Sequence, residues 1–177
     1  MDYQIEARSV MILAEIVTND KGQKVVEIDT IAFSSKRRID WAGVEEYLKK
    51  YVGQKYQIDE TDDLIYIGSD FPDEYANSNY SARAHGTIGK AKANASQVIP
   101  ELIKIATNIV YRDNSDDKHS KDAKFGWYRC TVRFTLPTCD DKGNVIGKNA
   151  FQGRMIIRFD EDGKKYLYDI IDIKKET

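Results

Sequence analysis

Residue types that build common structural and metal sites are scarce in this sequence. The 177 residues include two cysteines, two histidines and three prolines. Cys130 and Cys139 lie nine positions apart without a Cys-x-x-Cys motif, and a single possible pair makes no disulfide framework. His85 and His119 are the histidines that could join them. Because the ligand spacing of a zinc site is missing, we expect neither a metal nor a cofactor.

Long apolar runs and an excess of one charge are also missing. No stretch approaches the roughly 18–20 apolar residues of a membrane-spanning helix. Residues 1–6 carry acidic side chains where a secretory signal peptide would carry Lys or Arg, so we expect a cytoplasmic protein without a membrane partner. Lysine plus arginine total 27 and aspartate plus glutamate 29. This balance excludes a histone-like, purely electrostatic binder of nucleic acid, but it allows a local basic patch.

Apolar and aromatic residues are plentiful. Hydrophobic residues make up 41% of the chain and include 11 Tyr, 6 Phe and 2 Trp, enough for the core of one domain or two very small ones. Residues 10–17 and 24–33 are rich in β-branched side chains and flank Asn-Asp-Lys-Gly at 19–22, a pattern typical of a β-hairpin. The first arm could equally begin as a helix, because short apolar runs are ambiguous.

Helices are expected in the middle of the chain, over 41–52, 71–83 and 87–107, with a short strand at 64–67. Asp40 and Asp70 stand where the first two helices need an N-terminal cap. Pro100 lacks a backbone N–H group, so it must kink the third helix or begin another.

The last third of the sequence alternates between apolar and polar residues. From Trp127 to Leu136 the even-numbered side chains are apolar and most odd-numbered ones are polar, as in a strand with one buried face. Turn signals separate this strand from two more, which include 151–159 and 164–173. Helices followed by such strands predict an α+β fold, in which helices pack on an antiparallel β-meander and a β-hairpin forms an N-terminal extension.

Four arginines would share the polar face of this meander if the chain turned near residues 142–143. They are Arg129 and Arg133 on the first strand, and Arg154 and Arg158 on the second. A guanidinium group matches a phosphate with two parallel hydrogen bonds, so the face could hold a nucleic-acid backbone. The alternative is a solvated face whose arginines pair with nearby carboxylates.

The histidines and two lysines are further candidates. His119 lies among lysines, which favour the neutral imidazole that can act as a general base. His85 precedes a helix that carries Lys90 and Lys92 near its start, and the positive end of a helix can hold an anion. The alternatives are a surface histidine in a charged loop and ordinary helix packing.

Short segments after residue 65 carry a family resemblance. They read FPDEYA at 71–76, GKAKANA at 89–95, IPELI at 99–103, KHSKDAK at 118–124, GWYR at 126–129, and LYDI and IKKE at 167–170 and 173–176. In this order they resemble the large polyvalent protein-associated domain, which occurs in very long proteins of phages, plasmids and conjugative elements. The resemblance covers roughly 65–177, and we expect residues 1–64 to form an extension within one compact unit.

That domain is distantly similar to the barnase–EndoU–colicin–RelE superfamily of RNases, in which helices pack on an antiparallel sheet. The resemblance implies RNA as the partner and metal-independent cleavage as the reaction, with His119, Arg129 and Arg133 as catalytic residues. Contacts to RNA would come from Arg154, Arg158, Lys90, Lys92 and His85. No obvious glutamate base lies on the polar face, so a descendant that binds RNA without cleaving it is an open alternative.

Origin in a mobile element implies two other functions. Free-standing proteins of such elements include anti-CRISPR proteins, so the chain could be a non-catalytic inhibitor that binds a host defence nuclease or its guide RNA. It could also be an interaction module in a phage or conjugation protein.

Overall fold

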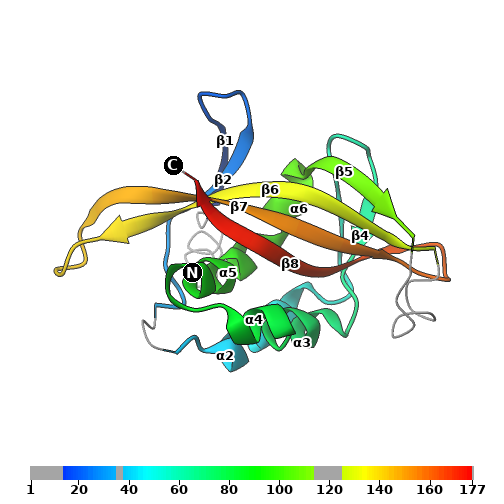
Figure 1. Ribbon diagram of the computed structural model, residues 1–177, viewed down its shortest axis with the longest axis horizontal. Coiled ribbons are helices and arrows are strands. Elements are labelled where there is room, and N and C mark those ends of the chain that lie inside the picture. The colour runs from blue at the N-terminus through cyan, green and yellow to red at the C-terminus, as the bar shows by residue number, and fades with distance from the viewer. Residues whose placement is uncertain (1–13, 35–37, 114–124, 177) are drawn as a thin grey trace, which may run out of the picture.

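The computed structural model describes residues 14–34, 38–113 and 125–176. Within these ranges a curled eight-stranded sheet runs through the molecule, and the helices lie together below its long strands (Figure 1). The expected combination of helices and strands is confirmed as a mixed α/β architecture.

The first two strands lie at one end of the sheet. β1 (Ala14–Thr18) and β2 (Lys24–Ile28) run antiparallel. Between them the Asn19 side chain accepts a hydrogen bond of 2.9 Å from the backbone N–H of Gln23, which closes the turn. β2 then pairs in parallel with β6 (Trp127–Cys139), which joins the start of the chain to the last third.

The helix expected over 41–52 begins where the sequence predicts. In α2 (Trp41–Leu48) the Asp40 side chain accepts a hydrogen bond of 3.0 Å from the backbone N–H of Gly43, as an N-terminal cap does. A short 3-10 helix (Lys49–Tyr51) continues the chain. Val44 of α2 is buried in the core.

Two short strands form the other end of the sheet. β3 (Lys55–Gln57) and β4 (Leu64–Tyr66) pair antiparallel. β4 pairs in parallel with β8 (Lys165–Glu176), and Ile65 lies opposite Lys165. The sheet is therefore mixed, because two of its strand pairs, β2 with β6 and β4 with β8, are parallel, and neither of them was predicted from the sequence.

The single helix expected over 71–83 is two helices, α3 (Phe71–Ala76) and α4 (Asn79–Arg83). Ser78 has extended backbone angles, and its side chain accepts a hydrogen bond of 3.2 Å from the backbone N–H of Ser81. A serine in the cap position thus ends one helix and begins the next, which apolar spacing alone did not indicate.

The expected break at Pro100 is present. α5 (Gly86–Ala95) leads through a 3-10 helix (Ser96–Val98) into α6 (Ile99–Ile105), with Pro100 in the first turn, where a missing N–H group is tolerated. The expected helical continuation to 107 is wrong, because the chain leaves α6 as β5 (Thr107–Arg112), which pairs antiparallel with β6.

The long strands form the middle of the sheet. β6, β7 (Val145–Phe159) and β8 are neighbours in the strand order β1-β2-β6-β7-β8-β4-β3, and β5 lies beside β6. Cys130, Val132 and Phe134 of β6 are buried in the core. The intervening side chains therefore point to the face away from the helices.

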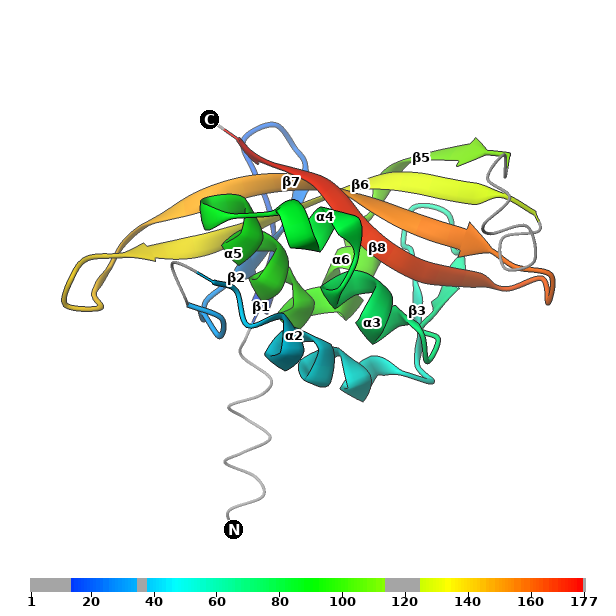
Figure 2. The same cartoon turned by 60° about the horizontal axis from the view of Figure 1, so that its bottom comes forward.

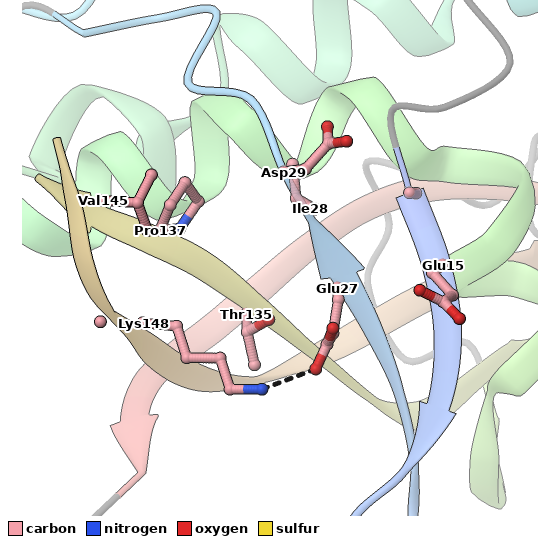
Figure 3. Close-up of a pocket in the computed structure, with 10 residues that line it drawn as sticks. Glu15, Glu27, Ile28, Asp29, Thr135, Pro137, Val145 and Lys148 are labelled. Atoms are coloured by element: carbon pink, nitrogen blue, oxygen red, sulfur yellow. Dashed lines mark hydrogen bonds and ion pairs between the residues drawn. The ribbon is translucent and has the colours of Figure 1, made fainter. Parts of the chain in front are cut away.

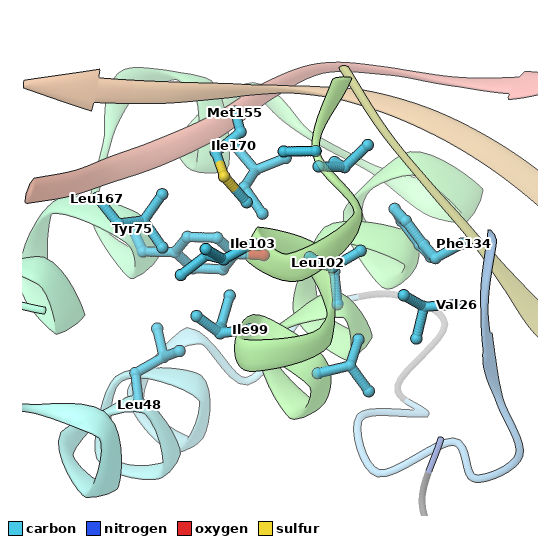
Figure 4. Packing of buried hydrophobic residues seen from close by; sticks show 14 of the residues in the cluster. Val26, Leu48, Tyr75, Ile99, Leu102, Ile103, Phe134, Met155, Leu167 and Ile170 are labelled. Carbon is cyan, nitrogen blue, oxygen red and sulfur yellow. The ribbon is translucent and has the colours of Figure 1, made fainter. Parts of the chain in front are cut away.

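The core lies between the sheet and the helices. Figure 4 shows Met155, Leu167 and Ile170 of the strands gathered with Leu102 and Ile103 of α6 around the ring of Tyr75. The same cluster includes Val26, Val44 and Leu48, so residues on both sides of position 64 share one core. In Figure 2 the helices lie together across one side of the long strands, and the opposite face of these strands carries the candidate site.

Candidate anion-binding site on the sheet

Five arginines lie on the face of the sheet that points away from the helices, here called the arginine face. Strand register places Thr131 opposite Arg154 across β6 and β7, so both point to this face. The arginines come from three neighbouring strands: Arg112 of β5, Arg129 and Arg133 of β6, and Arg154 and Arg158 of β7. Arg112 is an addition to the set predicted from the sequence.

A hollow of about 240 Å³ opens on this face beside β5. It is lined by Asn108, Val110, Arg112, Arg129, Cys130, Thr131 and Arg154. The pairing of β5 with β6 shifts register between Thr107 and Val110, where Asn108 has a φ of 55°. Such a bulge interrupts the strand ladder and redirects side chains, and here it places an amide beside three guanidinium groups.

Arg129 has a hydrogen-bond donor that no acceptor in the described protein satisfies. Its Nε is buried and has no hydrogen-bond partner. Within the described residues, neither Arg129 nor Arg112 forms an ion pair. A buried donor without a partner costs about 1–3 kcal/mol, so an anion that accepted this N–H group would be favoured there.

Arg154 has a partner that it can exchange. Its Nη1 lies 3.2 Å from Oδ2 of Asp172, and about half of each side chain is exposed. An ion pair this exposed contributes about 0–1 kcal/mol, so a phosphate could replace the carboxylate at little cost. Thr131, which lies opposite Arg154, adds a hydroxyl donor to the same hollow.

Arg133 lies further along the face and is more enclosed. Its Nε is 3.6 Å from Oε1 of Glu176, and its Nη2 donates a hydrogen bond of 3.4 Å to Gln152. Neither contact is short, and Nε is buried without a hydrogen bond. Arg133 therefore extends the positive surface and is partly neutralised.

Arg158 is held by the protein itself. Its guanidinium group donates hydrogen bonds to Asp70 at 2.8 Å and to Asp160 at 2.7 Å, and the side chain is 9% exposed. Burial alone would lower the pKa of Arg158, but the two carboxylates raise it above its ordinary value. The Asp70 side chain thus accepts a hydrogen bond from Arg158 of β7. It makes no capping hydrogen bond to α3, so the expectation that its side chain caps this helix is wrong. Arg158 is not available to RNA in this arrangement.

The lysines and His85 lie elsewhere. Lys92 is fully buried, and its Nζ is 2.6 Å from Oδ1 of Asp169, so the expectation that it contacts RNA is wrong. α5, which carries Lys90 and Lys92, packs on the helix side of the sheet. His85 stands exposed at the start of α5, on this opposite side from the arginine face. His119 falls outside the described residues.

A larger groove, of about 740 Å³, lies between the β1–β2 pair and the ends of β6 and β7 (Figure 3). Glu15, Glu27 and Asp29 line it, and Lys148 donates a hydrogen bond of 2.6 Å to Glu27. The carboxylates outnumber the cation, so this groove does not suit a polyanion. Among the described residues no group of three or more His, Cys, Asp or Glu side chains is arranged to hold a metal ion.

Two residues of the hollow, Arg112 and Asn108, were not predicted from the sequence, although the sequence carries weak signals for both. Thr-Asn-Ile-Val-Tyr-Arg at 107–112 is β-branched and aromatic enough for a strand, which would have placed Arg112 near the face. Asn108 owes its position to the bulge, and its tolerance of positive φ is the one local hint.

The chain matches no protein-family model, no curated protein and no solved structure. In the part of the chain that the structure describes, no helix is long and apolar enough to cross a membrane.

Proposed function

We propose that this chain is a mobile-element protein that binds single-stranded RNA through the arginine face. The observation that carries the proposal is the hollow beside β5, where Arg112, Arg129 and Arg154 converge and the Nε of Arg129 has no partner. The choice of RNA over other polyanions rests on the family resemblance.

The chemistry of the hollow suits a phosphodiester. Guanidinium groups donate paired hydrogen bonds to phosphate oxygens, and the Thr131 hydroxyl and Asn108 amide can donate to a third oxygen. Arg133 would meet the next phosphate along the strand. The chain has a net charge of −2, so attraction is local to this face and should be strongly salt-dependent.

The binding test compares two arginine variants with a matched control. We expect Arg129→Ala and Arg112→Ala each to weaken binding of a short fluorescein-labelled RNA by about tenfold, because each removes a charge-assisted contact. Each should also reduce the slope of log affinity against log salt by about 0.7. Fluorescence anisotropy between about 50 and 200 mM salt measures both quantities. Arg83→Ala, which removes an exposed arginine from α4 on the helix side, should change neither.

Equal affinity for all three variants would contradict the proposal, and so would absence of RNA binding by the unaltered protein. Single-stranded DNA of the same sequence is the second ligand, because contacts to phosphates alone do not distinguish the two sugars.

Cleavage is a separate step of the proposal. In metal-free transesterification, a general base removes the proton from the 2′-hydroxyl, and arginines stabilise the charge that develops on the phosphate. Among the described residues, the arginine face offers Arg129 and Arg133 for the second role and no imidazole for the first. His119 would have to supply the base. Loss of cleavage in EDTA by His119→Ala, with RNA affinity retained, would support this role; no cleavage by the unaltered protein would leave binding as the function.

A non-catalytic inhibitor of a host nuclease is the second candidate. Val145 and Ile146, at the turn end of β7, are 66% and 68% exposed. Two adjacent exposed aliphatic side chains offer a small apolar surface that another protein could cover. If this candidate holds, Val145→Ser with Ile146→Ser would abolish inhibition of the nuclease and leave the RNA affinity unchanged.

A further inference from the structure

Four aromatic side chains surround a second hollow, of about 490 Å³, at the end of the sheet where β5 and β6 meet. They are Tyr111, Phe125, Tyr128 and Phe159, here called the aromatic hollow. Tyr111 is 47% exposed, which is high for an aromatic ring. The protein thus keeps rings at the surface where burial would have been more favourable.

The rings form a chain of contacts around the hollow. The centroids of Tyr111 and Tyr128 are 5.3 Å apart, those of Tyr128 and Phe159 are 5.9 Å apart, and those of Phe159 and Phe125 are 5.2 Å apart. The Tyr111 hydroxyl donates a hydrogen bond of 2.5 Å to the backbone carbonyl of Phe125, which fixes the exposed ring. The walls are therefore held in place before any ligand arrives.

A cation lies against the same rings. Nζ of Lys165 is 4.8 Å from the centroid of Tyr128 and 5.4 Å from that of Phe159. Asp63 holds this ammonium group at 2.6 Å. The hollow thus offers flat apolar walls with an ion-paired lysine on one side, which suits a flat ring.

The aromatic hollow and the arginine face meet at β5. Tyr111 lies opposite Tyr128 in the pairing of β5 with β6, and Arg112 lies opposite Trp127. Because successive side chains of a strand point to opposite faces, Tyr111 faces the aromatic hollow and Arg112 the arginine face. In the described part of the chain β5 pairs with β6 alone, so it is an edge strand that a ligand can cross.

We propose that the aromatic hollow binds one nucleobase of the strand whose phosphates lie on the arginine face. This inference rests on the proposed function, and it specifies a single-stranded ligand with an unstacked base. The base stacks on Tyr111 and Tyr128 while Arg112 contacts the neighbouring phosphate across the edge of β5. A duplex keeps its bases stacked and paired, so it cannot fill the hollow.

The test compares a short single-stranded RNA with an otherwise identical strand of abasic ribose phosphates. We expect the abasic strand to bind about tenfold more weakly, within the range for loss of a base stacked on an aromatic ring. Tyr111→Leu should weaken binding of the RNA by a similar factor and leave the affinity for the abasic strand unchanged. Tyr111→Phe keeps the ring and should retain most of the RNA affinity. Tyr47→Leu, which alters a tyrosine on α2, is the matched control and should change neither affinity.

The outcomes separate the two proposals. If the RNA and the abasic strand bind equally, and Tyr111→Leu changes neither affinity, the base site is overturned while the arginine face stands. If neither strand binds, the proposed function fails and the base site fails with it. A Tyr111→Leu variant that weakens both strands equally would also overturn the base site, because it would indicate a general change in the sheet edge.

Discussion

Two cysteines of one strand differ in their surroundings. Cys130 is buried in β6, with its Sγ 3.8 Å from the backbone carbonyl of Met155, and burial raises the pKa of its thiol to about 12. Cys139, at the end of the same strand, is exposed. Since the thiolate is the reactive form, these two positions should react at very different rates.

We expect Ellman's reagent near pH 8 to modify Cys139 in the folded protein and to leave Cys130 unmodified. Absorbance should report one thiol per chain in native buffer and two in denaturant, where the pKa of Cys130 returns to its ordinary value. The control is Cys139→Ser, which should show no reactive thiol until it unfolds. Two thiols reacting at equal rates in native buffer would contradict the burial of Cys130.

Sequence patterns predict which face of the sheet an arginine lies on, but they do not predict whether a carboxylate binds it. Alternation along β6 and β7 correctly placed Arg129 and Arg154 on one face, because strand periodicity is a local property. It could not reveal that Arg158 is bound by Asp70, a residue 88 positions earlier in the chain. Whether an arginine is available depends on such distant partners.

At the scale of elements, one buried ion pair connects α5 to β8. Nζ of Lys92 lies 2.6 Å from Oδ1 of Asp169, 3.4 Å from the Ser78 hydroxyl and 4.6 Å from the centroid of Tyr75. Burial lowers the pKa of Lys92 and raises that of Asp169, since it disfavours both charged forms more than their attraction compensates. The pair therefore orients α5 on the sheet at a considerable desolvation cost.

We expect Lys92→Met to lower the free energy of unfolding by about 3–5 kcal/mol, because it leaves the Asp169 carboxylate buried without a cation. The double variant Lys92→Met/Asp169→Leu should regain most of this loss, because an apolar pair of similar volume needs no solvation. Urea denaturation followed by circular dichroism measures both values. The single variant Asp169→Leu completes the comparison. If the double variant lost as much free energy of unfolding as the two single variants lose together, the two residues would not be coupled.

The elements that sequence patterns predicted are those with local signals. Asp40 caps α2 and Pro100 begins α6, each through contacts within one turn. β5 was missed because six residues in a polar context give little periodicity. The parallel pairing of β2 with β6 was missed for another reason, since it joins strands with no sequence feature in common.

At the scale of the whole molecule, the core does not divide at residue 64. Val26 and Leu48 from the first part of the chain lie in one cluster with Leu102 and Phe134 from the second. β3 and β4, at one end of the sheet, straddle the same boundary. Removal of the first part would therefore expose the apolar face of α6 and the sheet.

We expect a chain that begins at residue 65 to lose cooperative unfolding, whereas the full chain should unfold in one transition. The reason is that the shorter chain lacks part of the shared core and the partner strand of β4. Tryptophan fluorescence and circular dichroism, followed against urea, should coincide for the full chain. A sharp transition of the shorter chain at the same urea concentration would mean that residues 65–177 fold independently.

The parallel pair at one end of the sheet has a consequence for synthesis on the ribosome. β4 emerges early, but it needs β8, and the paired residues Ile65 and Lys165 are 100 positions apart. At rates of about 5–20 residues per second, roughly 5–20 s pass before the partner strand exists. During that interval β3 can already pair with one edge of β4, but the other edge has no partner in the nascent chain. The order of synthesis therefore leaves this end of the sheet open until the last strand has been made.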